Sequence, residues 1–444
     1  MSESNFLNRL PSERLENHYQ PSKPLFDASE ARFEANRCLY CSDAPCIKAC
    51  PTSIDIPKFI KQIENDNLRG AGKTIFSQNL LGSTCSSACP VEELCVGSCV
   101  YNELNDTPIQ IGRLQQYATK HAIDSEKQSG RKLLDKKPSL GKEVALIGAG
   151  PASLSCAAEL ALNGVTPVIY ERSSLPGGLN TTGIAPYKLK SEDALNEVEW
   201  LLSHGIEIKT GVEVGKDISA AELEAKYDAV FVGIGLGQDK LLDLPGLEGP
   251  GVFSATALIR EIKNSNDFQI PSHVRRISVI GGGNTAIDVA REFAKLGKYE
   301  VQMIYRGCED KMSGYKHELA GARKEAVAFK TNFSPTAILR NENGDITHVK
   351  VQSTSQDYNQ NSELELESDW VVFAVGVEKF TFVKDWFAKL ELDERSCIKV
   401  DESTFETNHP NVYAGGDCIN GGMEVVNAVA HGRDAARSMI QKWI

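Results

Sequence analysis

The order of apolar and polar residues marks two places where a buried strand runs directly into a helix. The apolar runs Val144–Ile147 and Ile277–Ile280 are short and nearly uninterrupted, as in strands buried on both faces of a parallel sheet. Each run is followed at once by a glycine cluster and then by a helical stretch. The pattern therefore predicts two copies of one β-α-β unit, which are internal repeats of each other.

The region before the first unit has a different character. Eight of the twelve cysteines lie between Cys38 and Cys99, among helix-forming and turn residues without a strong strand signal. The polar, basic stretch 127–142 reads as a linker that ends where the first strand begins. We therefore predict a separate, helical N-terminal domain.

The first glycine cluster, residues 148–153, matches the dinucleotide pattern G-x-G-x-x-G except that Ser153 stands at the last position. Gly148 permits the tight turn, Gly150 lets a pyrophosphate approach the backbone, and the helix that follows points its N-terminal amides at the phosphates. Glu171 ends the next predicted strand, where a carboxylate can accept hydrogen bonds from an adenosine ribose. The alternative is a plain glycine turn beside a solvated Glu171.

Two further segments resemble flavoprotein signatures. They are Pro176–Leu179 and the short strand that leads into Gly415-Gly416-Asp417. In two-dinucleotide flavoproteins the corresponding aspartate holds the FAD ribitol, a role that the resemblance implies for Asp417. The stretch from Val425 to Ala436 reads as a helix whose N-terminus could stabilise negative charge on a reduced flavin. The candidate FAD-binding residues are Gly148, Gly150, Ala152, Glu171, Gly178, Leu179 and Asp417.

The second glycine cluster, residues 281–286, reads G-x-G-x-x-A and should bind a nicotinamide dinucleotide. The strand after it ends in Arg306, which can receive a 2′-phosphate, but the neutral and acidic residues 307–310 follow. We therefore expect NADH rather than NADPH. The candidate NAD-binding residues are Gly281, Gly283, Asn284, Thr285 and Arg306.

The order of the signatures predicts nested domains, because the FAD motifs lie on both sides of the second glycine cluster. The expected fold class is an N-terminal α-helical iron–sulfur domain plus two nested Rossmann-like α/β domains. We assign residues 1–138 to the helical domain, 139–261 and 377–444 to the FAD-binding domain, and 262–376 to the NAD(P)-binding domain. Ala374-Val375-Gly376 resembles the return crossing into the FAD domain.

The cysteine spacing indicates iron–sulfur clusters. The first group reads Cys38-x2-Cys41-x4-Cys46-x3-Cys50-Pro51, close to the ferredoxin run, and the second reads Cys85-x3-Cys89-Pro90-x4-Cys95-x3-Cys99. Two 4Fe-4S clusters fit this number of thiolates. Thiolates also suit zinc, so two structural zinc sites are the alternative.

With these motifs in place, nearly the whole chain resembles the electron-input subunit of NAD-dependent dihydropyrimidine dehydrogenase, a relative of the glutamate synthase small subunit. The likeness is carried by residues 38–51, Asp55-Ile56-Pro57, residues 94–99 and the run Ile111–Gln116. It implies one cluster on Cys38, Cys41, Cys46 and Cys99, and another on Cys50, Cys89, Cys95 and Gln115. Cys85 would then be a spare cysteine.

The resemblance also implies an activity and a partner. The chain is expected to take hydride from NADH and to pass electrons to a second subunit that carries FMN and further clusters. On that subunit uracil or thymine and its 5,6-dihydro form interconvert, so the chain works in a hetero-oligomer. Hydride transfer needs positioning and electrostatics, and we name no general acid or base in this chain.

Composition narrows the setting. The 444 residues carry a net charge of −12, which argues against nucleic acid or an anionic membrane as partner. No apolar run reaches the roughly 18 residues that span a bilayer, and residues 1–20 lack a signal-peptide core, so we expect a cytoplasmic protein.

Two other functions stay open at this point. The first is the reductase subunit of glutamate synthase or of another acceptor protein; the resemblance to the pyrimidine branch rests on Gln115, where glutamate synthase small subunits carry an acid nearby. The second is a non-catalytic assembly protein with zinc in its cysteine domain. Both intact glycine clusters, Glu171 and Asp417 count against the second.

Overall fold

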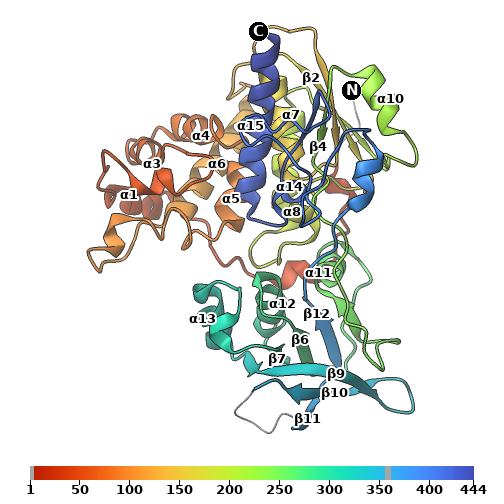
Figure 1. Ribbon diagram of the computed structural model, residues 1–444. Coiled ribbons are helices and arrows are strands. Elements are labelled where there is room, and N and C mark those ends of the chain that lie inside the picture. Colours follow the sequence, from red (N-terminus) through yellow and green to blue (C-terminus); the bar gives the residue numbers. More distant parts are fainter. Residues whose placement is uncertain (1–4, 356–361) are drawn as a thin grey trace.

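The computed structural model describes residues 5–355 and 362–444. Figure 1 shows the helical N-terminal part beside the long C-terminal helix, with one parallel sheet above and another below. No helix in the described ranges is both long and apolar enough to cross a membrane.

The N-terminal part is built from helices, and the structure has no strand between residues 5 and 142. Helix α3 shows why: Asp55 accepts a hydrogen bond from Lys58 N, Pro57 lies in the first turn, and the apolar residues of the helix form one buried face. The helices are α1 Ala28–Asn36, α2 Pro45–Lys48, α3 Ile56–Glu64, α4 Leu68–Phe76, α5 Gly82–Ala88 and α6 Ile111–Ser129.

The predicted linker begins slightly later than expected. Helix α6 continues to Ser129 and ends at Gly130, which has a left-handed φ of 68°. Residues 127–129 therefore form the last turn of the helix. Their polar side chains make this turn look like part of the linker. The linker runs from Gly130 to Lys142.

The first parallel sheet has the order β13-β4-β1-β2-β3. Strand β1 is fully buried after its first residue, as its apolar run requires. The strands are β1 Glu143–Ile147, β2 Thr166–Glu171, β3 Glu207–Thr210, β4 Ala229–Val232 and β13 Val412–Ala414. The accompanying helices are α7 Pro151–Leu162, α8 Leu179–Thr182, α9 Ser191–Leu202, α10 Ala220–Lys226, α14 Asp417–Asn420 and α15 Val425–Trp443.

The second parallel sheet repeats the design with the order β5-β12-β6-β7-β8. Its strands are β5 Val252–Ser254, β6 Arg276–Ile280, β7 Glu300–Tyr305, β8 Ala328–Thr331 and β12 Trp370–Phe373. Its helices are α11 Ala255–Asn264, α12 Asn284–Lys295 and α13 Lys316–Lys324. Strand β5 pairs with β12 in this sheet, although we assigned its residues to the FAD-binding domain. A three-residue strand carries too little pattern to show which sheet it joins.

A small antiparallel sheet with the order β11-β10-β9 extends the second sheet at its lower end (Figure 1). Its strands are β9 Phe333–Arg340, β10 Ile346–Ser353 and β11 Glu363–Glu367. Short 3-10 helices cover Leu7–Arg9, Leu15–His18, Val100–Asn102, Glu309–Lys311 and Thr381–Asp385.

The helical part packs directly on the first sheet's layer of helices. The ring of Phe76 lies 4.4 Å from the ring of Trp200 on α9, centroid to centroid. Glu197 on the same helix accepts hydrogen bonds from Ser83 N and Thr84 N at the start of α5, at 2.7 and 2.8 Å. On α15, Arg433 Nη1 donates to Thr52 O at 2.7 Å. These contacts fix the cysteine region against the first sheet.

Candidate functional site

The first glycine cluster forms a tight loop between β1 and α7. Gly148 has a φ of 89°, and a Cβ there would lie 2.7 Å from Gly233 O. Helix α7 starts at Pro151, with Gly150 as its N-cap and no side chain capping its amides. The free amide groups of this first turn suit a pyrophosphate, because they carry the positive end of the helix dipole.

Glu171 is folded back onto this loop from the end of β2. Its Oε2 accepts from Ala149 N and its Oε1 from Ser173 N, both at 2.7 Å, and the residue is only 8% exposed. Each carboxylate oxygen keeps a second acceptor position, which a ribose diol could use. Glu171 is therefore a buried part of the loop and not a solvated side chain.

The second flavin signature lies against the first. Gly177 N donates to Ala149 O at 2.8 Å. Gly178 has a φ of 57°, and a Cβ there would lie 3.0 Å from Gly150 Cα. Leu179, the first residue of α8, is 47% exposed although it is apolar. The segment Pro176–Leu179 thus lies against the first glycine loop and leaves the apolar side chain of Leu179 exposed.

The C-terminal signature, which is distant in the sequence, reaches helix α7 as well. Gly416, with a φ of 79°, packs so closely that a Cβ would lie 3.1 Å from Ala152 Cβ. Asp417 follows it, and its Oδ1 accepts from Met423 N at 3.1 Å. Burial raises the pKa of Asp417, and the positive charge of Lys379 opposes that rise. The three candidate FAD segments therefore meet at one place, and the residues present fit FAD.

The second glycine cluster repeats the first. Gly281 has a φ of 147°, and a Cβ there would meet Ala374 O at 2.4 Å. Helix α12 starts at Asn284 after Gly283, again without a side-chain cap, and Thr285 is exposed in its first turn. These features fit a second dinucleotide.

Arg306 lies exposed after β7, at the expected position. No hydrogen bond or ion pair holds its guanidinium within the described part of the chain. Of the two acids that follow, Glu309 is paired with Arg323, whereas Asp310 is exposed. Within residues 5–355 and 362–444, Asp310 is therefore the acid of this pair that has no ion-pair partner.

Tyr315 connects the second dinucleotide loop to the helix after Asp417. Its backbone N donates to Asn284 Oδ1 at 2.9 Å, and its hydroxyl donates to Glu424 Oε1 at 2.6 Å. Glu424 is the N-cap residue of α15. Nothing in the sequence pattern singled out Tyr315, because both partners are distant in the chain.

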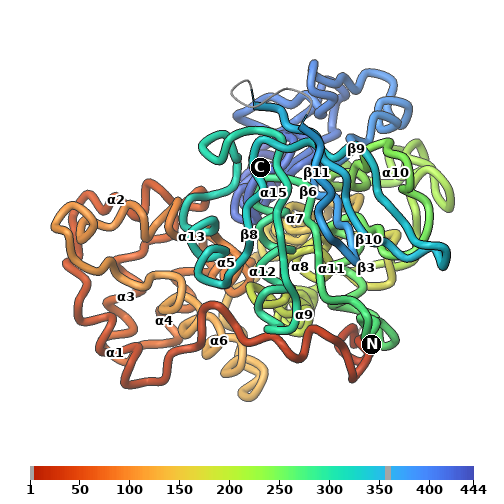
Figure 2. The backbone as a smooth tube through the Cα atoms, turned by 90° about the horizontal axis from the view of Figure 1, so that it is seen from below, coloured from red at the N-terminus to blue at the C-terminus, as the bar shows by residue number. Residues whose placement is uncertain are grey.

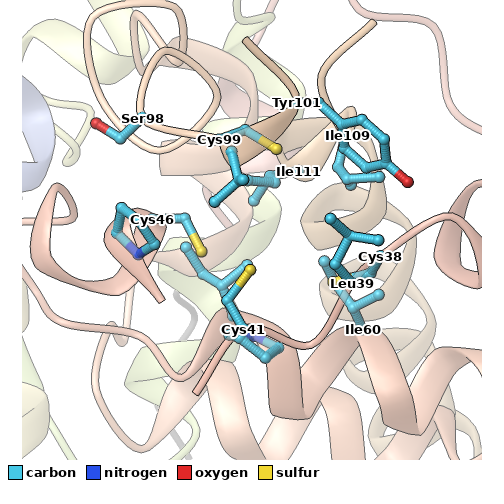
Figure 3. A pocket seen from close by; sticks show the side chains of 14 residues that line it. Cys38, Leu39, Cys41, Cys46, Ile60, Ser98, Cys99, Tyr101, Ile109 and Ile111 are labelled. Atoms are coloured by element: carbon cyan, nitrogen blue, oxygen red, sulfur yellow. The ribbon is translucent and has the colours of Figure 1, made fainter. Parts of the chain in front are cut away.

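Four of the predicted cysteine ligands line one pocket. Figure 3 shows the sulfurs of Cys41, Cys46 and Cys99 turned toward a common space, with Cys38 on the wall beside Leu39. The space measures about 400 Å³ including its open side. Burial, and then the neighbouring thiols of Cys38 and Cys99, raise the pKa of Cys46 to about 12. Apolar side chains form most of the remaining wall: Leu39, Pro45, Ile56, Pro57, Ile60, Val100, Ile109 and Ile111.

The second predicted set lies deeper, against the core of the first sheet. Cys89 belongs to that core, and Cys50 and Cys95 pack on it. Burial, followed by the thiols of Cys89 and Cys50, raises the pKa of Cys95. These three cysteines are therefore near neighbours.

Gln115 is buried on α6 with 7% exposure, so it is not a solvated helix residue. Its Nε2 donates to Gly82 O at 2.7 Å, which leaves the amide oxygen as the end that could bind iron. Cys85 is also buried, and its neighbouring thiol, followed by burial, raises the pKa of Cys89.

The sulfurs line these spaces without converging on a point. Within residues 5–355 and 362–444, no three His, Cys, Asp or Glu side chains are grouped so that they could hold a metal ion. In a four-iron cluster each thiolate binds a different iron, and four thiolates are the usual ligand set. The first set has that composition. In the second set, three thiolates and one amide oxygen would complete the ligands.

Two family models match the chain. Residues 142–432 match "Pyridine nucleotide-disulphide oxidoreductase". Residues 14–127 match the model described as dihydropyrimidine dehydrogenase domain II, 4Fe-4S cluster.

Two curated relatives from Escherichia coli (strain K12) are similar over almost their full length. The glutamate synthase [NADPH] small chain is 33% identical over 96% of this chain and 93% of its own. The NAD-dependent dihydropyrimidine dehydrogenase subunit PreT is 34% identical over 96% of this chain and 97% of its own.

Solved structures share the fold. T. acidophilum thioredoxin reductase superposes with a TM-score of 0.55 at 22% identity, covering 68% of this chain and 99% of its own. A 2-naphthoyl-CoA reductase superposes with a TM-score of 0.53 at 18% identity, covering 88% of this chain and 49% of its own.

Proposed function

The chain belongs to the pyridine nucleotide-disulphide oxidoreductase family, and on that basis we propose that it is the NADH-oxidising, electron-input subunit of a cytoplasmic dihydropyrimidine dehydrogenase. The coarser part of this statement follows from the family itself: the chain is an NAD(P)H-dependent flavin oxidoreductase with a 4Fe-4S domain. The acceptor, the preferred nucleotide and the number of clusters are the proposed parts.

One observation carries the proposal. Both cysteine sets lie in a helical domain that packs on the same sheet whose loop collects Gly148, Gly178 and Asp417. When bound there, FAD supplies the conversion of a two-electron hydride into single electrons. The chain's own residues fix the loop, hold the pyrophosphate at α7 and keep water from the buried cysteines.

We assign one cluster to Cys38, Cys41, Cys46 and Cys99 and a second to Cys50, Cys89, Cys95 and Gln115. Cys50 and Cys95 of the second set pack both on the core of the first sheet and on the core of the helical domain, whereas Cys38, Cys46 and Cys99 of the first set pack on the helical core. The second cluster would therefore lie between the flavin and the first cluster.

The partner in this proposal is a catalytic subunit that carries FMN and further clusters and binds uracil or thymine. The similarity to the PreT subunit supports it, and so does the buried Gln115. The similarity to the glutamate synthase small chain favours a second candidate, the reductase subunit of glutamate synthase. Gln115 supports the first candidate, because the resemblance implies an acid near this position in glutamate synthase small subunits.

We propose NADH as the donor because Arg306 is followed by two neutral residues and then by the acids Glu309 and Asp310, of which Asp310 is exposed. A 2′-phosphate is usually held by several basic groups.

The test begins with the visible spectrum and the iron, zinc and flavin content of anaerobically purified protein. We expect flavin and about eight irons per chain, as two four-iron clusters require, with faster bleaching by NADH than by NADPH. A colourless zinc protein would refute the reductase function.

NADH consumption is then measured with each candidate partner. Uracil-dependent consumption with the FMN subunit supports the pyrimidine assignment, and consumption only with the glutamate synthase large subunit refutes it.

A further inference from the structure

The N-terminal segment Tyr19–Phe26 runs between the nucleotide-binding sheets and the helical domain. Figure 2 shows the chain crossing from its N-terminus beneath α9 and α11 to α1. Ser22 N donates to Tyr187 O at 2.7 Å on one side. On the other side, Arg113 Nε donates to Pro24 O at 2.7 Å. Lys23 lies between these two anchors, so its backbone position is fixed by both parts of the molecule.

The side chain of Lys23 reaches the second cysteine set. Its Nζ donates to Cys89 O at 2.7 Å, to Ser87 O at 3.1 Å and to Ser86 O at 3.5 Å. Three carbonyl acceptors match the three N–H groups of an ammonium ion, so this geometry suits the charged form. The carbonyls belong to the last turn of α5 and its C-cap, which is the negative end of the helix dipole.

The surroundings leave this charge without a partner carboxylate. No Asp or Glu in residues 5–355 and 362–444 comes within ion-pair distance of Lys23 Nζ. Burial lowers the pKa of Lys23, and the negative charges of Cys89, Glu92 and Cys95 oppose that fall. Gly112, in the first turn of α6, leaves the space open. A Cβ there would lie 3.2 Å from Ser86 O and 4.0 Å from Lys23 Nζ.

We propose that Lys23 raises the reduction potential of the iron–sulfur cluster held by Cys50, Cys89 and Cys95, because it places an unpaired positive charge at the backbone of Cys89. The inference rests on the proposed function. Reduction adds one electron to the cluster, donated by the reduced flavin of the same chain, and neither makes a bond nor moves a proton. The added negative charge is stabilised by a nearby cation, and local charge is a known determinant of cluster potential.

The experiment is a potentiometric titration of the full, cluster-loaded chain, followed by electron paramagnetic resonance. Lys23→Met removes the charge and Lys23→Arg retains it. Lys120→Met is the matched control, because Lys120 is exposed on α6 and pairs with Asp124 at 3.3 Å. In Lys23→Met we expect at least a tenfold fall in the equilibrium constant for reducing one cluster, equivalent to 59 mV for a one-electron couple. In Lys23→Met, the equilibrium constant for reducing the other cluster should change less than twofold. In Lys23→Arg and in Lys120→Met, the constants of both clusters should change less than twofold.

Unchanged potentials in a Lys23→Met protein with full iron content would overturn the inference. If that variant loses iron, the titration is repeated on Lys23→Gln, which is neutral but keeps N–H donors. Iron loss in both neutral variants also counts against the inference, because Lys23 would then be needed for assembly and not for tuning. A wild-type protein without cluster signals would instead refute the proposed function itself.

Discussion

Glu197 is a single residue whose protonation should be measurable in the stability of the whole chain. Burial raises the pKa of Glu197 to about 7, although hydrogen bonds from the backbone of Thr84 and Ser83 lower it. The native state therefore binds this proton more tightly than the unfolded state does. The stabilising contribution is complete below the ordinary value of 4.5 and is lost as pH rises through about 7.

We therefore expect the melting temperature of the wild type, relative to Glu197→Gln, to fall between pH 5 and pH 8. Full ionisation of Glu197 should lower the free energy of unfolding by about 3 kcal/mol, because one pKa unit corresponds to 1.36 kcal/mol. Glu197→Gln should be less stable at pH 5, because an amide nitrogen cannot accept from one of the two backbone donors. Thermal melts across this range check the sign, and a difference that stays flat or grows with pH contradicts it.

Arg306 is the residue on which nucleotide choice depends. Its guanidinium is exposed after β7 and would be the main group available to a 2′-phosphate. Arg306→Ala should lower kcat/KM for NADPH by about tenfold, since a charge-assisted hydrogen bond contributes about 1.5–3 kcal/mol. The value for NADH should stay within about twofold, because the lost contact is made only to the 2′-phosphate. Equal losses for both nucleotides would show that Arg306 does not read the 2′ position.

At the scale of elements, the loop between β1 and α7 depends on a residue without a side chain. Gly148→Ala would put a methyl group 2.7 Å from Gly233 O at a φ of 89°. The left-handed conformation alone costs about 1–2 kcal/mol, and the clash adds to it. We expect purified Gly148→Ala to carry less than about a tenth of the wild-type FAD, since each 1.36 kcal/mol lost is a factor of ten.

Gly297→Ala is the matched control for this prediction. Gly297 follows α12 with a φ of 66°, and a Cβ there meets no atom within 4 Å. It should therefore lose about 1 kcal/mol of stability from the backbone term alone while keeping its FAD. Similar FAD loss in both variants would point to general destabilisation and not to the loop.

At the scale of the whole molecule, Arg433 on α15 joins the first sheet's layer of helices to the helical N-terminal domain. Its Nη1 donates to two backbone carbonyls of the helical N-terminal domain, Thr52 O at 2.7 Å and Gln78 O at 2.9 Å. Arg433→Ala leaves these carbonyls without their donor and should loosen the docking of the second cysteine set. Flavin bleaching by NADH should keep its rate, whereas iron–sulfur bleaching should slow by about tenfold, because small displacements reduce transfer steeply.

Stopped-flow absorbance separates the two phases. Lys442→Ala, near the end of α15, serves as the control, since Lys442 is exposed and pairs with Glu406 at 3.0 Å. Equal slowing of both phases in Arg433→Ala would place the defect in nucleotide binding instead of domain docking.

The sequence alone determined the parts whose signals are local. The strands at Val144–Ile147 and Ile277–Ile280, the helix starts after Gly150 and Gly283, and the helix from Val425 all occur as predicted. Strand burial, glycine turns and helix starts depend on residues within a few positions of each other. For that reason they leave a readable pattern in the chain.

Tertiary structure decided what depends on distant partners. It buried Gln115 against Gly82, placed Lys23 at Cys89, joined Glu197 to α5 and put β5 into the second sheet. Each of these contacts joins segments that lie 30 to more than 100 residues apart, so no local periodicity records them. Burial and charge at the cysteines, which set how they can serve a cluster, arise only when the separate elements pack together.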